Sequence, residues 1–431
     1  MLAPGSNPNS ITGALIGYCH GEALSRLHTV TFVIEARHEE AVSKAMGEFY
    51  AVEAIQASWL DRFYKWVFRC VFKQDYGNLF WTALCFPLPI VFEWRVWRQF
   101  RPRILRGEFD VVLRILPIVP TMASPFAYFL RKGPVPFVIG PLNGGLPWPK
   151  GFSQLDRQLP AASYWAGIVR NLYRFLPFAR STYAKATAII AGSSNTCREF
   201  ARYRDKVFYV PGENGVNSKW LMDRPASGPE SKERLELIMV NRLVPLKACD
   251  LALRGAASLL REGRAHLSIL GEGPERERLE NLTDELGVRS AVTFCGWVSH
   301  AETLSRLRGS DVLLFPSLRE FGGGVVFEAL ATGTVPVVAD FGGPGDIVTE
   351  EVGYRIPLTN EHQMAAQIES VLAHLASDRL HLETLRQQGL AYTREHLTWE
   401  AKAKMVAEIL MWATKLGPKP HMPPPKPVFI D

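Results

Sequence analysis

The stretch LREFGGGVVFEALATGTVPVVADFGG, residues 318–343, places three consecutive glycines before an apolar helical pattern and brackets them with Glu320 and Glu328. Glycines at a helix start let the backbone approach a ligand closely, and the first N–H groups of a helix have no partner within it. Such a helix start readily binds an anion, above all a phosphate. We therefore predict that these glycines make room for a diphosphate.

From about residue 233 the sequence alternates β-rich apolar runs with helical patterns. The predicted strands are 235–240, 266–270, 291–295, 311–315, 335–339 and 353–356, and the predicted helices are 249–262, 275–287, 300–308, 325–332 and 361–376. Continuous apolar strands separated by helices indicate a parallel sheet covered on both faces. In such a doubly wound domain, ligands bind beyond the carboxyl ends of the strands.

Cations follow the first of these strands. Arg242 and Lys247 come after residues 235–240. Together they would place a planar fork and a point charge on one anion. If the diphosphate is a leaving group, this pair stabilises the charge that develops as the bond breaks.

The two glutamates cannot bind phosphate, so we expect them to face hydroxyl groups if they line the same site. On a continuous helix, eight residues would span roughly 12 Å, which suits opposite ends of a nucleotide sugar. The carboxyl groups of a retaining glycosidase lie only about 5 Å apart. The alternative is that both glutamates are ordinary cap and surface carboxylates, because acidic residues favour helix starts.

The first half of the chain predicts a second Rossmann-like domain. Its predicted strands are 29–37, 109–115, 135–141, 186–193 and 206–212. We divide the chain into an N-terminal acceptor domain at 1–225 with an aromatic helical insertion at about 41–107, a nucleotide-sugar-binding domain at 226–396, a closing helix at 397–416 that returns toward the first domain, and a Pro-rich tail at 417–431. The linker is expected near 223–234, which has the Pro, Gly and Ser content of a boundary.

Charge and cysteine content limit the classes of partner and the compartment that we expect for this chain. The chain has 431 residues, with 49 basic and 43 acidic side chains and a net charge of +6. It shows no run of five or more like charges, so nucleic acid is not the expected partner, whereas an anionic small molecule or a membrane surface remains open. The six cysteines form no C-x-x-C pair, which favours a reducing cytoplasm over a zinc site or a disulfide framework. We expect neither a signal peptide nor a membrane-spanning segment, because the first ten residues lack the pattern of the former and no apolar run reaches about 20 residues.

The segment from NRLVPLK to FGGPGDIV, residues 241–348, resembles the retaining GT-B glycosyltransferases of family 4, in which seven residues separate two glutamates. GENGVN (212–217) and TWEAKAKMVAEIL (398–410) fit the same layout. The resemblance implies an α/β GT-B fold, with two Rossmann-like domains whose parallel sheets face each other across a cleft. It also implies transfer of a sugar from a nucleotide-sugar donor, with retention, to a glycan or lipid-linked saccharide of a cell-surface polysaccharide.

The resemblance also implies roles for individual residues. Glu320 would contact hydroxyls of the transferred sugar and Glu328 the ribose diol, while Arg242 and Lys247 would hold the diphosphate. The remaining donor contacts would come from the amides of Gly323, Gly324 and Val325 and, beside the base, from Gly296, Trp297 and Val298. The departing phosphate would help to deprotonate the acceptor. We expect a hexosyltransferase that needs no metal ion, because the chain lacks an Asp-x-Asp motif and two cations can serve the phosphates.

Two further segments have a residue content that suits ligand or membrane contact. The loop GPLNGGLPWP (140–149) would border the acceptor or donor cleft through Asn143 and Gly144, and a purely structural turn is an equal alternative. The segment 58–74 interleaves aromatic and basic residues, which suits peripheral contact with the inner face of an anionic membrane. The alternative is a helix packed against its own domain.

The sequence departs from the family at two places. It begins with MLAPGSNPNSITG, which is loop-like, so the first strand of the N-terminal sheet is expected to be missing. Leu113 and Arg114 stand where many family members carry a histidine that contacts the donor sugar. These departures keep open a non-catalytic nucleotide-sugar-binding protein. A nucleotide-sugar epimerase is a second rival, because it shares the two-domain Rossmann architecture.

Overall fold

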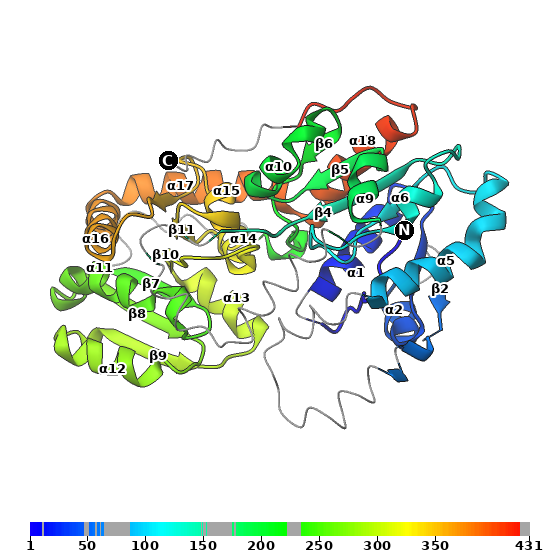
Figure 1. Ribbon diagram of the computed structural model, residues 1–431. Helices are drawn as coiled ribbons and strands as arrows, with labels where there is room; N and C mark the ends of the chain where they lie inside the picture. Colours follow the sequence, from blue (N-terminus) through cyan, green and yellow to red (C-terminus); the bar gives the residue numbers. More distant parts are fainter. Residues whose placement is uncertain are drawn as a thin grey trace. The chain divides into compact units, whose positions relative to one another are not determined.

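The computed structural model describes residues 1–10, 13–46, 51–56, 58–60, 62–63, 87–147, 149, 152, 175, 178–221 and 234–422 (Figure 1). The chain forms two compact units. Unit 1 consists of Met1–Gly145, Gln158–Glu213 and Lys402–Asp431, and unit 2 consists of Leu146–Arg157 and Asn214–Ala401. The expected first domain ended at Pro225. In the structure Leu146–Arg157 belongs to unit 2, and the chain passes from unit 1 to unit 2 after Glu213.

Unit 2 is built on a parallel sheet of six strands in the order β12-β11-β10-β7-β8-β9 (Figure 1). Its strands are β7 (Leu235–Val240), β8 (Ala265–Leu270), β9 (Val292–Gly296), β10 (Val312–Phe315), β11 (Val335–Ala339) and β12 (Tyr354–Ile356). This is the doubly wound order, in which the direction of winding changes between β7 and β10. The prediction of a doubly wound parallel sheet in this half of the chain is confirmed.

Helices cover both faces of the unit 2 sheet. They are α11 (Cys249–Arg261), α12 (Arg276–Glu285), α13 (His300–Gly309), α14 (Gly324–Ala331), α15 (Gly342–Ile347), α16 (Glu361–Ser377) and α17 (Arg379–Tyr392). Successive residues of β7 enter different cores: Leu237 lies in the cluster that contains residues of α11 and α16. Ile238 lies in the cluster that contains residues of α14. Burial on both faces explains why this strand is a continuous apolar run.

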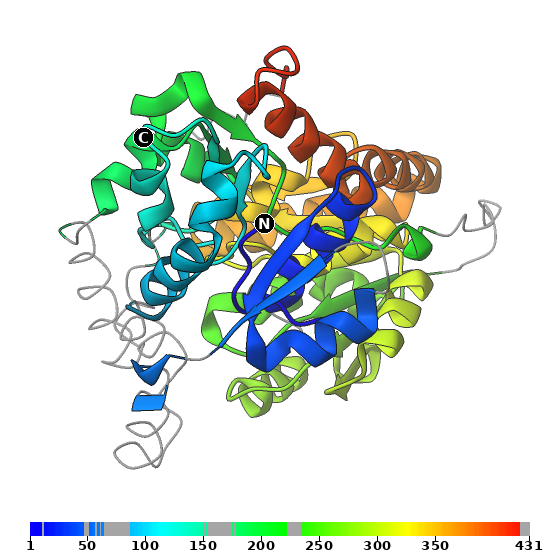
Figure 2. The same cartoon turned by 90° about the vertical axis from the view of Figure 1, so that its right-hand side faces the viewer.

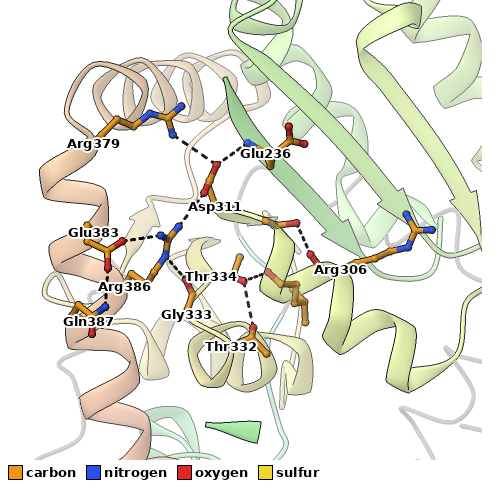
Figure 3. Close-up of polar contacts among 12 residues, drawn as sticks. Glu236, Arg306, Asp311, Thr332, Gly333, Thr334, Arg379, Glu383, Arg386 and Gln387 are labelled. Atoms are coloured by element: carbon orange, nitrogen blue, oxygen red, sulfur yellow. Dashed lines mark hydrogen bonds and ion pairs between the residues drawn. The ribbon is translucent and has the colours of Figure 1, made fainter. Parts of the chain in front are cut away.

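A buried polar network fastens α17 to the amino ends of the strands (Figure 3). Asp311 precedes β10, accepts the backbone N–H of Glu236 at 2.9 Å and forms an ion pair with Arg386 of α17 at 3.0 Å. Arg386 also donates through Nε to the carbonyl of Gly333 at 2.8 Å. The network lies at the opposite edge of the sheet from the strand ends where ligands bind.

Unit 1 contains a second set of parallel strands. β3 (Val112–Arg114), β4 (Phe137–Leu142), β5 (Ala188–Ala191) and β6 (Val207–Tyr209) form a four-stranded sheet, and β1 (Thr31–Glu35) pairs with β2 (Ala51–Ile55). The helices of this unit include α1 (Gly13–Ser25), α2 (Glu39–Met46), α5 (Pro87–Leu105), α6 (Pro125–Phe129), α9 (Ala179–Lys185) and α10 (Ser194–Glu199).

The N-terminal residues lie between these two groups of strands, although within the described residues no regular strand precedes β1. Leu2 makes parallel bridges to both Val33 of β1 and Arg114 of β3. Its N–H donates to Leu113 at 2.7 Å, and its carbonyl accepts from Ile115 at 3.0 Å. Residues 1–3 therefore lie beside β1 (Figure 2), and their backbone groups pair with residues of both β1 and the β3 region.

The expected helical insertion at 41–107 is only partly helical. Ala51–Ile55 is a strand whose five residues pair in parallel register with Thr31–Glu35. The 19-residue helix α5 accounts for the C-terminal part of the range. Most of the segment 58–74 and the whole of 64–86 lie outside the described residues, as do 222–233 of the linker and 423–431 of the tail.

The last helix, α18 (Trp399–Ala413), begins in unit 2 and continues in unit 1. Its buried Lys402 donates to the carbonyl oxygens of Pro211 and, at 3.0 Å, Gly212, which follow β6. Burial lowers the pKa of Lys402 to about 7. Within the part of the chain that the structure describes, no helix has the length and apolar character needed to cross a bilayer.

Candidate functional site

The ion pair between Lys247 and Glu320 joins two loops at the switch point of the unit 2 sheet. Lys247 ends the 3-10 helix η5 (Pro245–Lys247) after β7, and Glu320 lies in the loop after β10. The Lys247 ammonium donates to the Glu320 carboxylate, and the two side chains are 16% and 20% exposed. The N–H of Leu318 donates to the carbonyl of Leu246 at 2.9 Å, so the backbones of the two loops are also tied together.

Arg242 follows β7 directly and stands apart from this pair. Its side chain is exposed, and within the described parts of the chain it forms no ion pair. Its positive charge is therefore uncompensated by the described carboxylates. An arginine in this state, at the carboxyl end of a strand next to the switch point, suits an incoming anion.

The glycine-rich helix start has the backbone conformation that its sequence requires. Gly323 precedes α14 with φ 60° and ψ 46°, a left-handed conformation that favours glycine. A Cβ atom at this position would lie 2.8 Å from Cγ of Pro344. Gly324 is exposed, and the helix begins there, so the N–H groups of Gly324 and Val325 have no partner within the helix, whereas that of Val326 donates to the carbonyl of Gly323 at 2.8 Å.

Glu320 precedes α14 and is not part of a continuous helix with Glu328, so the 12 Å span expected for such a helix does not apply. Its position is fixed by the start of α15. The N–H of Gly343 donates to the carbonyl of Glu320 at 3.1 Å, and a Cβ atom at Gly342, where φ is 66°, would collide with the same oxygen. The second glycine motif, FGGPG, thus lets α15 pack directly against the backbone of Glu320.

Glu328 has a partner that the sequence did not reveal. His300, the first residue of α13, lies with Nε2 2.9 Å from Oε1 of Glu328. The Trp220 ring packs edge-on against His300, with ring centroids 5.1 Å apart. The hydrogen bond to Glu328 raises the pKa of His300. The available signal was a histidine just after GWV, in the loop that follows a strand on the ligand-binding edge.

The three residues expected beside the base lie where β9 ends. Gly296 closes the strand with φ 69°, Trp297 is 73% exposed, and Val298 packs partly buried against the apolar cluster on one face of the sheet. Trp297 therefore offers a flat aromatic surface to a ligand. Contact with a base stays a prediction.

Residues 223–383 match the protein family described as Glycosyl transferases group 1. The chain carries a group 1 glycosyltransferase domain. All the site residues above, from Arg242 to Glu328, lie within this domain.

Curated proteins named as glycosyltransferases or synthases are also similar to this chain. An uncharacterized glycosyltransferase of Methanocaldococcus jannaschii is 30% identical over 249 residues, which cover 55% of this chain and 62% of that protein. A glycogen synthase of Mycobacterium tuberculosis is 30% identical over 221 residues, covering 49% of this chain and 50% of that protein. The chain thus matches between half and 62% of the length of these relatives.

The fold extends further than this sequence similarity. The crystal structure of Anabaena HepE in complex with UDP has a TM-score of 0.59 at 14% identity, covering 95% of this chain and 98% of that one. The chain therefore has the GT-B fold, with two Rossmann-like domains, as the sequence predicted.

Outside the group 1 glycosyltransferase domain, the loop after β4 holds Asn143 in the interior of unit 1. The side chain is 4% exposed, and Nδ2 donates to Oε2 of Glu213 at 2.5 Å. The carbonyl of the neighbouring Gly144 accepts from Nδ2 of Asn195 at 3.2 Å. The Asn143 side chain therefore positions the loop, and contact between the loop and an acceptor or donor stays a prediction.

Arg114, which stands near the position of the family histidine, has a structural role. It is fully buried in β3 and forms an ion pair with Glu93 of α5 at 3.0 Å. Ser124 Oγ donates to the other oxygen of Glu93 at 2.5 Å. Burial raises the pKa of Glu93. The arginine thus fastens α5 to the unit 1 sheet.

Proposed function

We propose that the protein is a retaining, metal-independent glycosyltransferase of the hexosyltransferase type. Its donor is a nucleotide-diphosphate sugar, and its acceptor is a glycan or a lipid-linked saccharide in the synthesis of a cell-surface polysaccharide. One observation carries this proposal: a lysine–glutamate pair and a glycine-rich helix start follow β7 and β10, the two strands that flank the switch point. Cations and helix N–H groups suit the diphosphate, and carboxylates suit sugar hydroxyls.

In the proposed reaction, the diphosphate replaces Glu320 as the partner of Lys247. Lys247, Arg242 and the first N–H groups of α14 then carry the negative charge of the phosphates. Glu320, released from the lysine, accepts hydrogen bonds from hydroxyls of the transferred sugar. Donor binding therefore breaks the ion pair between Lys247 and Glu320. It forms contacts of the lysine with the diphosphate and of the glutamate with the sugar.

The transfer itself needs no covalent intermediate on the protein. The bond between the anomeric carbon and the phosphate oxygen breaks as the acceptor oxygen attacks from the same face of the sugar. The acceptor proton passes to the departing phosphate, so the nucleoside diphosphate leaves with it. Arg242 and Lys247 stabilise the charge that develops on the leaving group.

The nucleoside would extend toward α13. Glu328, oriented by His300 at 2.9 Å, would accept from the ribose diol, and Trp297 would stack beside the base. The UDP in the HepE structure supports a nucleotide ligand for this fold. We place the enzyme in the cytoplasm, in part at the inner face of the membrane, where lipid-linked acceptors are found.

The test is product formation from a panel of UDP-, GDP- and ADP-sugars with a mixed glycolipid acceptor extract, followed by mass spectrometry with and without EDTA. We expect release of one nucleoside diphosphate in both conditions and its loss in Glu320→Ala. Donor binding without release would favour the nucleotide-sugar-binding protein. A changed donor sugar without any acceptor would favour the epimerase.

A further inference from the structure

The outward face of α5 in unit 1 combines aromatic, apolar and basic side chains. Trp94, Arg98, Arg101 and Leu105 follow one another at spacings of four, three and four residues, so they lie along one side of the helix. Trp94 is 47% exposed and Leu105 is 55% exposed, and both arginines are exposed. From Trp94 to Leu105 the stripe is about 16 Å long.

This stripe is not the face that holds α5 in the fold. Phe92, Val96, Phe100 and Ile104, each four residues from the next, are buried in the core of unit 1. They occupy the opposite side of the helix, and they account for its packing. The exposed tryptophan and leucine therefore have no part in the core of unit 1.

The neighbouring helix α6 and the residues after it also expose aromatic and basic side chains. Trp97 of α5 stacks on Phe129 of α6 at a centroid distance of 5.0 Å, which places the two helices together. Tyr128 is 39% exposed, the Arg131 guanidinium lies 3.6 Å from its ring centroid, and Lys132 is exposed. Arg98 likewise lies 4.9 Å from the ring centroid of Trp94.

No carboxylate of the described residues neutralises the positive charge of this face. Within the described ranges, neither Arg98 nor Arg101 forms an ion pair. The carboxylates at the end of α5 are already engaged: Glu108 pairs with Arg103 at 2.8 Å and with Arg106 at 2.7 Å, and Glu53 pairs with Arg103 at 3.2 Å.

We propose that this face, formed by Trp94, Arg98, Arg101 and Leu105 and bordered by Tyr128, Arg131 and Lys132, docks onto a bilayer that contains anionic lipids. Basic side chains are attracted to the anionic headgroups, and tryptophan and tyrosine favour the boundary between headgroups and acyl chains. A polyanion in water would satisfy the arginines but would leave Trp94 and Leu105 exposed. The mixed stripe is therefore best matched by a lipid surface. This inference depends on unit 1 alone and not on the proposed transfer reaction.

The experiment is co-flotation of the full chain with vesicles of phosphatidylcholine alone or mixed with phosphatidylglycerol. We expect binding to the mixed vesicles and its release by about 0.5 M salt, which shortens the Debye length. The double variants Trp94→Ala/Leu105→Ala and Arg98→Glu/Arg101→Glu should each reduce binding roughly tenfold or more. The matched control, Arg254→Glu/Lys404→Glu, reverses two exposed charges elsewhere and should bind like the unchanged protein.

Two results with the unchanged protein would overturn the proposal. One is equal binding to both kinds of vesicle, and the other is no binding to the mixed vesicles at low salt. Normal binding by Trp94→Ala/Leu105→Ala, together with full displacement by heparin, would instead indicate a site for a soluble polyanion. Circular dichroism and the thermal midpoint show that each variant folds. A variant that does not fold is replaced by its single substitutions.

Discussion

Lys247 and Glu320 neutralise each other across the switch point of the unit 2 sheet, although each suits a different part of a nucleotide sugar. By its charge the lysine suits a phosphate, and the carboxylate suits a sugar hydroxyl. The ion pair gives each of these two largely buried charges a partner. Under the proposed function, an incoming diphosphate therefore has to compete with Glu320 for Lys247.

The cations should be needed for turnover. We expect Lys247→Ala and Arg242→Ala each to lower kcat/KM at least tenfold, about 1.4 kcal/mol of transition-state stabilisation, because each carries charge on the leaving group. Steady-state release of nucleoside diphosphate measures the effect, with Arg254→Ala, an exposed arginine of α11, as the control. Near-normal turnover in both variants would remove the proposed mechanism.

The competition for Lys247 makes a second, opposite prediction. Glu320→Gln should bind the free nucleoside diphosphate more tightly, because the lysine no longer has a carboxylate partner, while sugar transfer should fall. Calorimetric titration with the product nucleotide and the transfer assay separate the two effects. Weaker nucleotide binding in Glu320→Gln would mean that the ion pair does not compete with phosphate.

The two neighbouring glycines at the start of α14 should respond differently to alanine. Gly323→Ala requires a side chain at φ 60° and brings Cβ to 2.8 Å from Pro344, so we expect a loss of roughly 1–2 kcal/mol of stability. At Gly324 a Cβ atom would meet only Nδ2 of Asn214, at 3.9 Å, so stability should be kept. If the helix start binds phosphate, Gly324→Ala should weaken donor binding all the same. Urea denaturation and donor titration of the two variants check both statements, and unchanged donor affinity in Gly324→Ala would argue against a phosphate close to this residue.

Strands that are buried on both faces could be predicted from the sequence. Half-buried strands, and backbone pairing between segments far apart in the sequence, could not. The run 235–240 matches β7 residue for residue because both of its faces are buried. Ala51–Ile55 was missed because it is mostly half-buried and contains Glu53, so it shows no apolar run. Met1–Pro4 reads as a loop because its partners, β1 and β3, are distant in the sequence.

The same limit applies to the site. A glycine run before a helix and cations after a strand are visible in a short stretch of sequence. Both features were therefore predicted from the sequence. The contact between His300 and Glu328 joins positions 28 residues apart and has no periodic pattern. The loop that contains Asn143 has the Gly and Pro content of a functional loop. The burial of the Asn143 side chain against Glu213, however, depends on the packing of unit 1.

The contact between His300 and Glu328 predicts a dependence of stability on pH. The pKa of His300 is raised in the folded state, so its contribution is fully present below the unfolded value of about 6.5 and is lost as the pH rises through the raised folded value. We expect His300→Gln to lower the thermal midpoint more at pH 5.5 than at pH 8.5. Glu328→Gln should abolish that difference, and an equal effect of His300→Gln at both pH values in the Glu328 protein would contradict the ion pair.

The network around Asp311 predicts a large loss of stability that is independent of the active site (Figure 3). Arg386→Met removes the ion pair that the Asp311 carboxylate, 4% exposed, makes at 3.0 Å, and breaking a buried pair costs about 3–5 kcal/mol. Arg379 approaches the same carboxylate at 3.7 Å and is 22% exposed, so Arg379→Met should cost at most about 1 kcal/mol. Urea midpoints followed by circular dichroism compare the two variants. At low temperature the folded fraction of Arg386→Met should keep its turnover, because the network lies at the amino ends of the strands. Equal midpoints for the two variants would show that Arg386 does not fasten α17 to the sheet, and lost turnover in folded Arg386→Met would show that the two edges of the sheet are coupled.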